Sequence, residues 1–316
     1  MVDSPYIPAE SVAVERRPAV GYAMVFSAAA LFAFNGAVSK VILHSGLSSL
    51  RLTEVRCTGA FLGLAAILLA TRPESLRTSP RELAFLAVFG VFAVAFVQLF
   101  YFLAIQRLQI GVALLIQYLG PLLVVLWARF VVKERVRRRI WAALVLAVAG
   151  LSLVVDVYGG VSLDGLGVVF ALVAAFIFAA YLLLAEHAVG RRDTLSLLCY
   201  GFFFATIFWA FAQPWWSFPG HAVSRRVSLL GHLAGSHLPV WALATWMIVL
   251  GTIFPFLLIV GSLRHLPATR VGIVAMFEPV AATIVAWAWL EESLGAMQLV
   301  GGAVVLAAIV LAQTAR

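Results

Sequence analysis

The sequence predicts an all-α integral membrane protein in which ten transmembrane helices form two inverted repeats of five helices. Three observations support this fold class. Of the 316 residues, 64% are hydrophobic and 11% are charged, whereas a soluble domain has about a quarter of its residues charged. Apolar runs near the ~20 residues that cross a bilayer follow one another along the chain. The sequence pattern of one of these runs recurs in another run 158 residues later.

Each apolar run is continuous, which favours helices. The strands of a transmembrane barrel would alternate apolar and polar residues, and backbone groups in lipid must otherwise be satisfied within a helix. The longest connector, about 217–239, is too short for a folded domain. The predicted spans are 20–43, 51–71, 82–105, 109–131, 140–157, 166–189, 195–216, 240–263, 268–290 and 294–315.

Residues 1–19 form a polar segment ahead of the first span. Arg16 and Arg17 followed by an apolar run resemble a signal peptide, but the run is too long and lacks a clear cleavage site. We expect a retained first helix behind a cytoplasmic N-terminal segment.

Basic residues predict the orientation. With ten helices both termini lie on one side, and that side holds fifteen of the 22 Lys and Arg residues. The other side holds four, and three lie within spans. Because Lys and Arg accumulate in cytoplasmic loops, both termini are expected in the cytoplasm, in the cell (inner) membrane. The four residues expected outside are Arg51, Arg107, Arg225 and Arg226.

A proline followed thirteen residues later by a glutamate marks the fourth and ninth spans. Pro121 and Glu134 stand in LIQYLGPLLVVLWARFVVKER, and Pro279 and Glu292 stand in VAMFEPVAATIVAWAWLEES. Both prolines are predicted to kink their helices. The two glutamates are expected to begin the fifth and tenth helices, where a carboxylate complements the helix dipole.

The first span also matches the sixth, with Gly21 and Phe32 falling 146 residues before Gly167 and Phe178. We expect one repeat over 20–157 and a second over 166–315. Five helices is an odd number, so the second repeat must be inverted. Inverted repeats are common in secondary transporters, whose substrate sites lie near the midplane.

Glu278 is the strongest candidate for substrate binding or coupling. It lies near the middle of the ninth span, where a buried charge costs about 2.5–3.5 kcal/mol and usually faces a cavity or partner. Pro279 beside it leaves a backbone carbonyl free. A carboxylate can also take up and release a proton, and a neutral Glu278 bonded to a neighbouring helix is the structural alternative.

Mid-span amides and phenols are further binding candidates, because they can hold a zwitterion without a fixed charge. They can equally serve as interhelical hydrogen bonds. Gln117 is favoured because it precedes Pro121. The set comprises Gln117, Asn35, Gln98, Tyr101, Tyr118 and Tyr181.

Arg56, Glu54 and Lys40 lie near the outer ends of the first two helices and are outer-gate candidates. Snorkelling to the interface is the alternative for the two cations. Cys57 and Cys199 both fall inside spans without metal-ligand spacing. We expect no metal and no cofactor.

The chain resembles the drug/metabolite transporter superfamily, in particular its ten-helix EamA-type exporters. The motifs that carry the resemblance are TEVRCTGAF with Arg56, QYLGPLLVVLWARFVVKE and MFEPVAATIVAWAWLEE. Many relatives have a Trp-Gly pair in the first helix, where this chain reads Phe34-Asn35-Gly36. The resemblance implies export of small metabolites such as amino acids or drugs.

The leading hypothesis is a secondary transporter, not an enzyme, that works by alternating access. Its expected partners are a small-molecule substrate and the lipid bilayer, with proton coupling and a homodimer left open and no nucleic acid. An intramembrane lipid-linked transferase and a non-transporting scaffold or receptor are the alternatives. A transferase would normally show clustered carboxylates or histidines near one interface, and Glu291 and Glu292 instead point apart on a helix.

Overall fold

The computed structural model describes residues 17–131, 133, 138–154, 164–189, 192–262, 264–266, 271, 274, 275 and 277–314. Helices dominate these residues, and one short antiparallel pair of strands is present. The α-helices are α1 (Pro18–His44), α2 (Ser49–Thr71), α3 (Pro80–Val88), α4 (Phe96–Ile105), α5 (Ile110–Gln117), α6 (Gly120–Phe130), α7 (Arg138–Val154), α8 (Gly165–Val189), α9 (Thr194–Ala212), α10 (Gly220–Ser224), α11 (Val240–Ile248), α12 (Phe254–Ser262), α14 (Phe277–Leu290) and α15 (Ala296–Thr314).

The expected all-α membrane class is confirmed. Six helical stretches are long and apolar enough to cross a membrane, and the described residues hold four shorter apolar helices besides. The six stretches are Pro18–His44, Ser49–Thr71, Pro80–Ile105, Gly165–Ala185, Thr194–Ala212 and Val240–Ser262.

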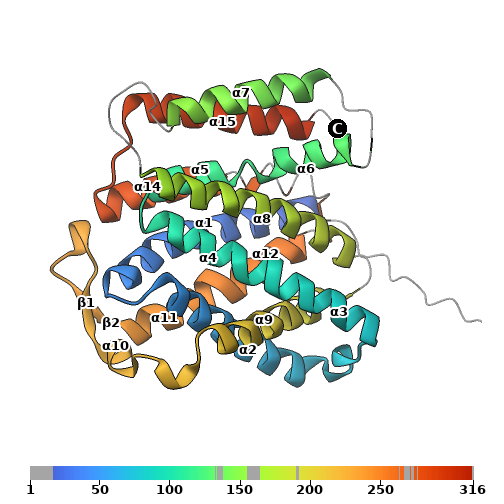
Figure 1. Ribbon diagram of the computed structural model, residues 1–316, viewed down its shortest axis with the longest axis vertical. Coiled ribbons are helices and arrows are strands. Elements are labelled where there is room, and N and C mark those ends of the chain that lie inside the picture. The colour runs from blue at the N-terminus through green and yellow to red at the C-terminus, as the bar shows by residue number, and fades with distance from the viewer. Residues whose placement is uncertain are drawn as a thin grey trace, which may run out of the picture.

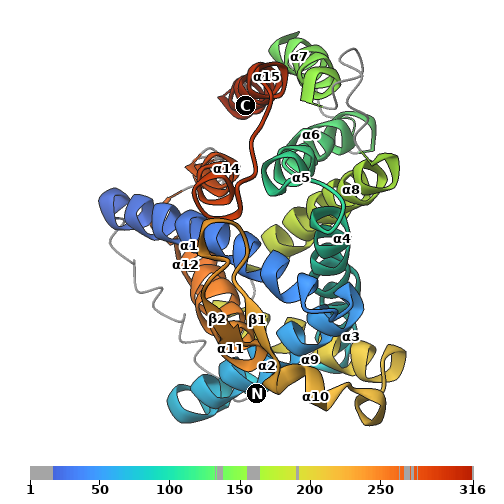
Figure 2. The ribbon, with the colours of Figure 1, turned by 90° about the vertical axis from the view of Figure 1, so that its left-hand side faces the viewer.

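The helices lie side by side, and helices that are distant in sequence meet in the middle of the molecule (Figure 1). At one end of the long axis α7 packs against α15, and at the other end α2 packs against α9. Between these pairs, α1 packs against α12 and α14, while α8 packs against α4, α5 and α6 (Figure 2). Helices α1 and α8 therefore lie between the two end pairs (Figure 1).

Two of the long stretches contain a π-helical segment. One, η2 (Phe89–Ala95), joins α3 to α4, and the other, η5 (Val249–Ile253), joins α11 to α12. In η5 the cause is local, because Pro255 has no N–H to donate to the carbonyl four residues earlier. In the same segment the hydroxyl of Thr252 donates to the carbonyl of Met247, five residues earlier, at 2.9 Å.

The connector between α9 and α11 is folded rather than extended. It contains the turns η3 (Trp215–Ser217) and η4 (Gly231–Leu233), and strands β1 (Arg226–Ser228) and β2 (His237–Pro239), which pair antiparallel. The indole N–H of Trp289 at the end of α14 donates to the carbonyl of Leu229 at 2.9 Å. This contact fixes the hairpin against α14.

Candidate functional site

Pro121 lies at a helix start, in the first turn of α6, and Glu278 and Pro279 lie in the first turn of α14 as the structure describes it. Helix α5 ends at Gln117, three residues before α6 begins, so the predicted span 109–131 is two helices. Proline is well tolerated in a first turn, because the missing N–H has no helical partner there. Pro121 thus accompanies a helix break, not a bend within one helix.

The hydroxyl of Tyr118 contacts both Glu278 and the carbonyl that Pro279 leaves free. Tyr118 Oη lies 2.8 Å from Glu278 Oε2 and 3.1 Å from the carbonyl oxygen of Ala275. In a continuous helix, that carbonyl would accept from the N–H of residue 279, which proline lacks. The hydroxyl can donate to a charged Glu278, or donate to Ala275 while accepting from a protonated Glu278. The pair therefore suits both protonation states of the carboxyl group.

The packing of α14 places Glu278 toward the neighbouring helices. Glu278 is partly buried, and Ala282, one turn further on the same face, is 1% exposed. On another face of the helix, Phe277 and Ile284 are exposed, as side chains that face lipid are expected to be. Glu278 therefore lies on the side of α14 that packs inside the protein.

Arg56 is held by a second carbonyl that a proline has freed. Its Nη2 donates to the carbonyl of Gly251 at 3.0 Å, and its Nε donates to Thr252 Oγ1 at 2.8 Å. Pro255 supplies no N–H for the Gly251 carbonyl, so that oxygen is available to the guanidinium. The guanidinium carbon also lies 5.3 Å from the ring centroid of Phe102. Arg56 is 4% exposed and so lies inside the protein.

Asn35 and Tyr101 fill the space around Arg56. Gly251 packs so closely on Asn35 that an added methyl group would overlap the Asn35 amide. At the next residue, a methyl group added to Gly36 would lie 2.9 Å from the hydroxyl of Tyr101. Helix α1, which carries Asn35 and Gly36, also packs against α14, the helix of Glu278. Residues from α1, α2, α4 and η5 thus form one polar cluster, and α1 joins it to α14.

Several buried polar atoms around this cluster have no hydrogen-bond partner among the described residues. Native proteins satisfy nearly all buried polar atoms, so such atoms indicate where water or a ligand binds. Asn35 is 2% exposed, Ser39 0% and Gln98 4%. The atoms are Asn35 Oδ1, Ser39 Oγ, Gln98 Oε1 and Nε2, and Gln117 Oε1.

A series of aromatic ring contacts extends from Tyr118 to Phe32. The Tyr118 ring lies 5.8 Å from Phe178, which stacks on Tyr181 at 6.2 Å. Tyr181 in turn meets Phe256 edge-on at 6.4 Å, and Phe256 meets Phe32 at 5.5 Å. Sequence reasoning chose Tyr181 but not Phe178, Phe256 or Phe32. Phe32 and Phe178 could have been found, because they match each other between the two predicted repeats.

The three outer-gate candidates belong to separate contacts. Lys40 pairs with Glu292 and donates to the carbonyl of Leu108 at 3.0 Å. Glu54 pairs with Arg51 at 2.6 Å, one turn away on α2. Arg56 belongs to the central cluster described above. The structure therefore does not bring these three side chains together.

Glu292 does not begin its own helix as expected. Helix α15 starts later, at Ala296, and the Glu292 carboxylate accepts from the backbone N–H of Ile110 at 3.0 Å. It thus caps α5, whose free N–H groups and positive dipole end favour a carboxylate. The matching expectation for Glu134 lies outside the described residues.

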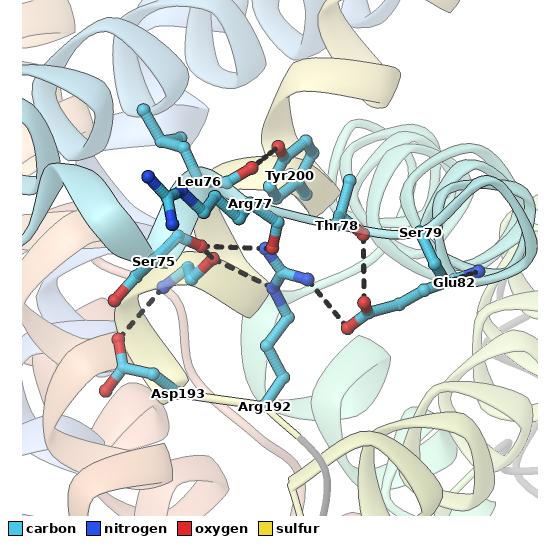
Figure 3. A network of polar contacts seen from close by, with 10 residues as sticks. Ser75, Leu76, Arg77, Thr78, Ser79, Glu82, Arg192, Asp193 and Tyr200 are labelled. Atoms are coloured by element: carbon cyan, nitrogen blue, oxygen red, sulfur yellow. Dashed lines mark hydrogen bonds and ion pairs between the residues drawn. The ribbon is translucent and has the colours of Figure 1, made fainter.

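A polar network also ties the α2–α3 connector to the start of α9 (Figure 3). Arg192 Nη1 lies 2.6 Å from Glu82 Oε1, and its Nη2 donates to the carbonyl of Ser75 at 2.8 Å. Asp193 pairs with Arg72 at 3.1 Å and with Arg264 at 3.4 Å. A cavity of about 400 Å³ lies beside these residues, lined by Met24, Ile67, Thr71, Arg72, Asp193, Thr194, Leu195, Leu257, Gly261, Arg264 and His265.

Fold and site together define a multi-pass helical membrane protein with charged groups buried between distant helices. The family model of the EamA-like transporter family matches residues 19–156 and, again, residues 165–314. The chain therefore belongs to the EamA-like transporter family. It is a membrane transporter, and a small molecule is its substrate.

Named relatives agree with this family. An uncharacterized transporter of Archaeoglobus fulgidus is 27% identical over 279 residues, 88% of this chain and 91% of the relative. The threonine/homoserine exporter RhtA of Escherichia coli K12 is 27% identical over 264 residues, 83% of this chain and 79% of the relative. A crystal structure with 18% identity has a TM-score of 0.62, covers 94% of this chain and 97% of its own, and shares the fold.

Proposed function

We propose that the protein is a secondary transporter that exports small metabolites, amino acids and related compounds first among them, by alternating access. One observation carries the proposal. Tyr118, at the break between α5 and α6 in the first family match, forms a hydrogen bond with Glu278 on α14 in the second. Alternating access requires a site that joins the two halves, and secondary transporters have it near the membrane midplane.

Contacts between the halves support an arrangement of two inverted five-helix repeats. A methyl group added to Gly21 would lie 2.6 Å from Leu266, and one added to Gly167 would lie 2.8 Å from Leu108. Gly167 follows Gly21 by 146 residues, and Leu266 follows Leu108 by 158, which are the offsets of the sequence repeat. Each half thus offers the other the same contact, as two halves related by a twofold axis would.

The π-helical segments support the same symmetry. Segment η2 ends at Ala95 and η5 ends at Ile253, again 158 residues apart.

With ten spans and the excess of basic residues on one side, both termini lie in the cytoplasm. The repeats then cover 20–157 and 166–315.

The Tyr118–Glu278 pair supports proton coupling as part of this proposal. The hydroxyl can hydrogen-bond to either protonation state of Glu278, so a proton can be exchanged without leaving a buried group unpaired.

The named activity of RhtA, threonine/homoserine export, supports amino acids over other metabolites as the substrate class. The unpartnered amides near Arg56 supply neutral hydrogen bonds for such a substrate.

The test is export from cells that express the protein and are loaded with mixed labelled amino acids and common cationic drugs. Wild type should export at least one compound, and Glu278→Gln should lose that export with membrane insertion intact. Glu74→Gln is the matched control, because Glu74 is exposed at a helix end. Wild-type export in Glu278→Gln would return Glu278 to a structural role, and no export by either form would contradict the proposal.

A further inference from the structure

Two opposite charges lie on helices that face the inside of the protein, one buried and one partly buried, without forming an ion pair among the described residues. Arg56 lies on α2 in the first family match, and Glu278 lies on α14 in the second. Helix α1 packs against both of these helices, and no salt bridge of the described residues joins the two charges. Neutral partners hold each one: Thr252 and the Gly251 carbonyl hold Arg56, and Tyr118 holds Glu278.

Both charged groups keep unused hydrogen-bonding capacity. A guanidinium has five N–H donors, and the hydrogen bonds of Arg56 to the described residues involve Nε and Nη2. Within that part of the chain its Nη1 is available to a carboxylate, which guanidinium binds well. The one hydrogen bond that Glu278 accepts from the described residues comes from Tyr118. Asn35 Oδ1, which packs on Gly251 beside Arg56, is a further acceptor without a described partner.

The net charge of this pair decides what it can accept. With Glu278 ionised, Arg56 and Glu278 sum to zero, so a zwitterion leaves the interior neutral, whereas a cation or an anion adds one uncompensated charge. An uncompensated charge inside a membrane is expensive. Removal of either residue would shift that balance by one unit and change which ligand charge the site favours.

We propose that Arg56 and Glu278 are the two poles of one site, and that Arg56 determines specificity by anchoring a substrate carboxylate and so rejecting organic cations. The ammonium group of the substrate lies at Glu278 and Asn35 Oδ1. The substrate thereby joins α2 of one half to α14 of the other. This inference rests on the proposed function and assigns the specificity of the same site.

The experiment is counterflow into proteoliposomes that hold the full-length protein. The probes are labelled L-amino acids including homoserine, their decarboxylated amines such as 3-aminopropan-1-ol, and their deaminated acids such as 4-hydroxybutyrate. Wild type should transport at least one amino acid at least tenfold faster than its amine and its acid. Transport of amines alone or of acids alone would contradict the two-pole site but would not contradict the proposed transport function. Transport of nothing would contradict the proposed function itself.

Variants separate specificity from structure. Arg56→Gln should reduce the tenfold preference over the amine to about twofold or less, and Arg56→Lys, which keeps the charge, should retain it. Arg51→Gln is the control, because Arg51 is also buried but pairs with Glu54. The control should leave the preference unchanged. Equal loss of all three probe classes in Arg56→Gln, with a monodisperse protein, would assign Arg56 a structural role and overturn the inference.

Discussion

Lys40→Met tests a contact that joins α1 to α5 and to the α14–α15 connector. The Glu292 carboxylate pairs with the Lys40 ammonium and accepts from the N–H of Ile110 at 3.0 Å. The two side chains are only 15% and 14% exposed. Methionine keeps the apolar stem of lysine and removes its charge. Glu292 is then left with the Ile110 amide as its described partner.

The expected loss follows from burial. Breaking a buried ion pair by removal of one partner costs about 3–5 kcal/mol. Because both side chains keep some exposure and Glu292 keeps one hydrogen bond, we expect about 2–3 kcal/mol. An unfolding entropy of about 2.1 cal/mol/K per residue gives roughly 0.7 kcal/mol/K for the 316-residue chain, so the Tm should fall by about 3–5 °C.

The chain carries its own probe for this measurement. Cys57 and Cys199 are its two cysteines, both free and buried, so a thiol-reactive fluorescent dye reports unfolding in detergent. Lys133→Met is the control, because Lys133 is the other lysine and is exposed. The double variant Lys40→Met with Glu292→Gln should lose less than the sum of the single losses. Full additivity, or a Tm for Lys40→Met within about 1 °C of wild type, would refute the reasoning.

Three further changes test other contacts. Tyr118→Phe removes a hydrogen bond to a charged group, worth about 1.5–3 kcal/mol, so the initial rate of transport at low substrate should fall at least roughly tenfold; an unchanged rate would remove Tyr118 from the site. Arg192→Lys cannot reproduce the forked contacts of the guanidinium and should cost about 1–2 kcal/mol, measured as a lower Tm. The N–H of Gly167 and then Arg107 hold the pKa of Asp164 below its usual range. Its contribution to stability is therefore present above the unfolded pKa and lost as pH falls through the folded pKa. Any Tm difference between wild type and Asp164→Asn should shrink as the pH falls below the unfolded pKa, and a difference that stays constant would contradict the assignment.

Local features of the site could be predicted from the sequence. That Pro279 leaves the carbonyl of residue 275 free follows from helix geometry alone. Pro255 carries the same signal for the carbonyl of Gly251. Which side chain takes each carbonyl could not be predicted, because Tyr118 and Arg56 lie 157 and 195 residues away from them.

The membrane class was predictable because apolar composition and run length suffice for it. The contacts between helix ends could not be predicted, because they depend on how the helices pack. Lys40 and Glu292 are 252 residues apart in the sequence. The prediction grouped Lys40 with Arg56 in one gate only because both lie near the outer ends of their helices. By contrast the Arg51–Glu54 pair is local, three residues apart on one helix, and its spacing could have indicated it.

The most direct test of alternating access is the accessibility of the site from both sides of the membrane. Ser39 suits this test, because it is buried, has no described hydrogen-bond partner and lies one turn from Asn35. Ser39→Cys would be made in a chain with Cys57 and Cys199 changed to Ala, and probed with a membrane-impermeant maleimide in intact cells and in inside-out vesicles. Alternating access predicts labelling from both sides, slowed by substrate. Labelling from one side only, whatever the substrate, would contradict it.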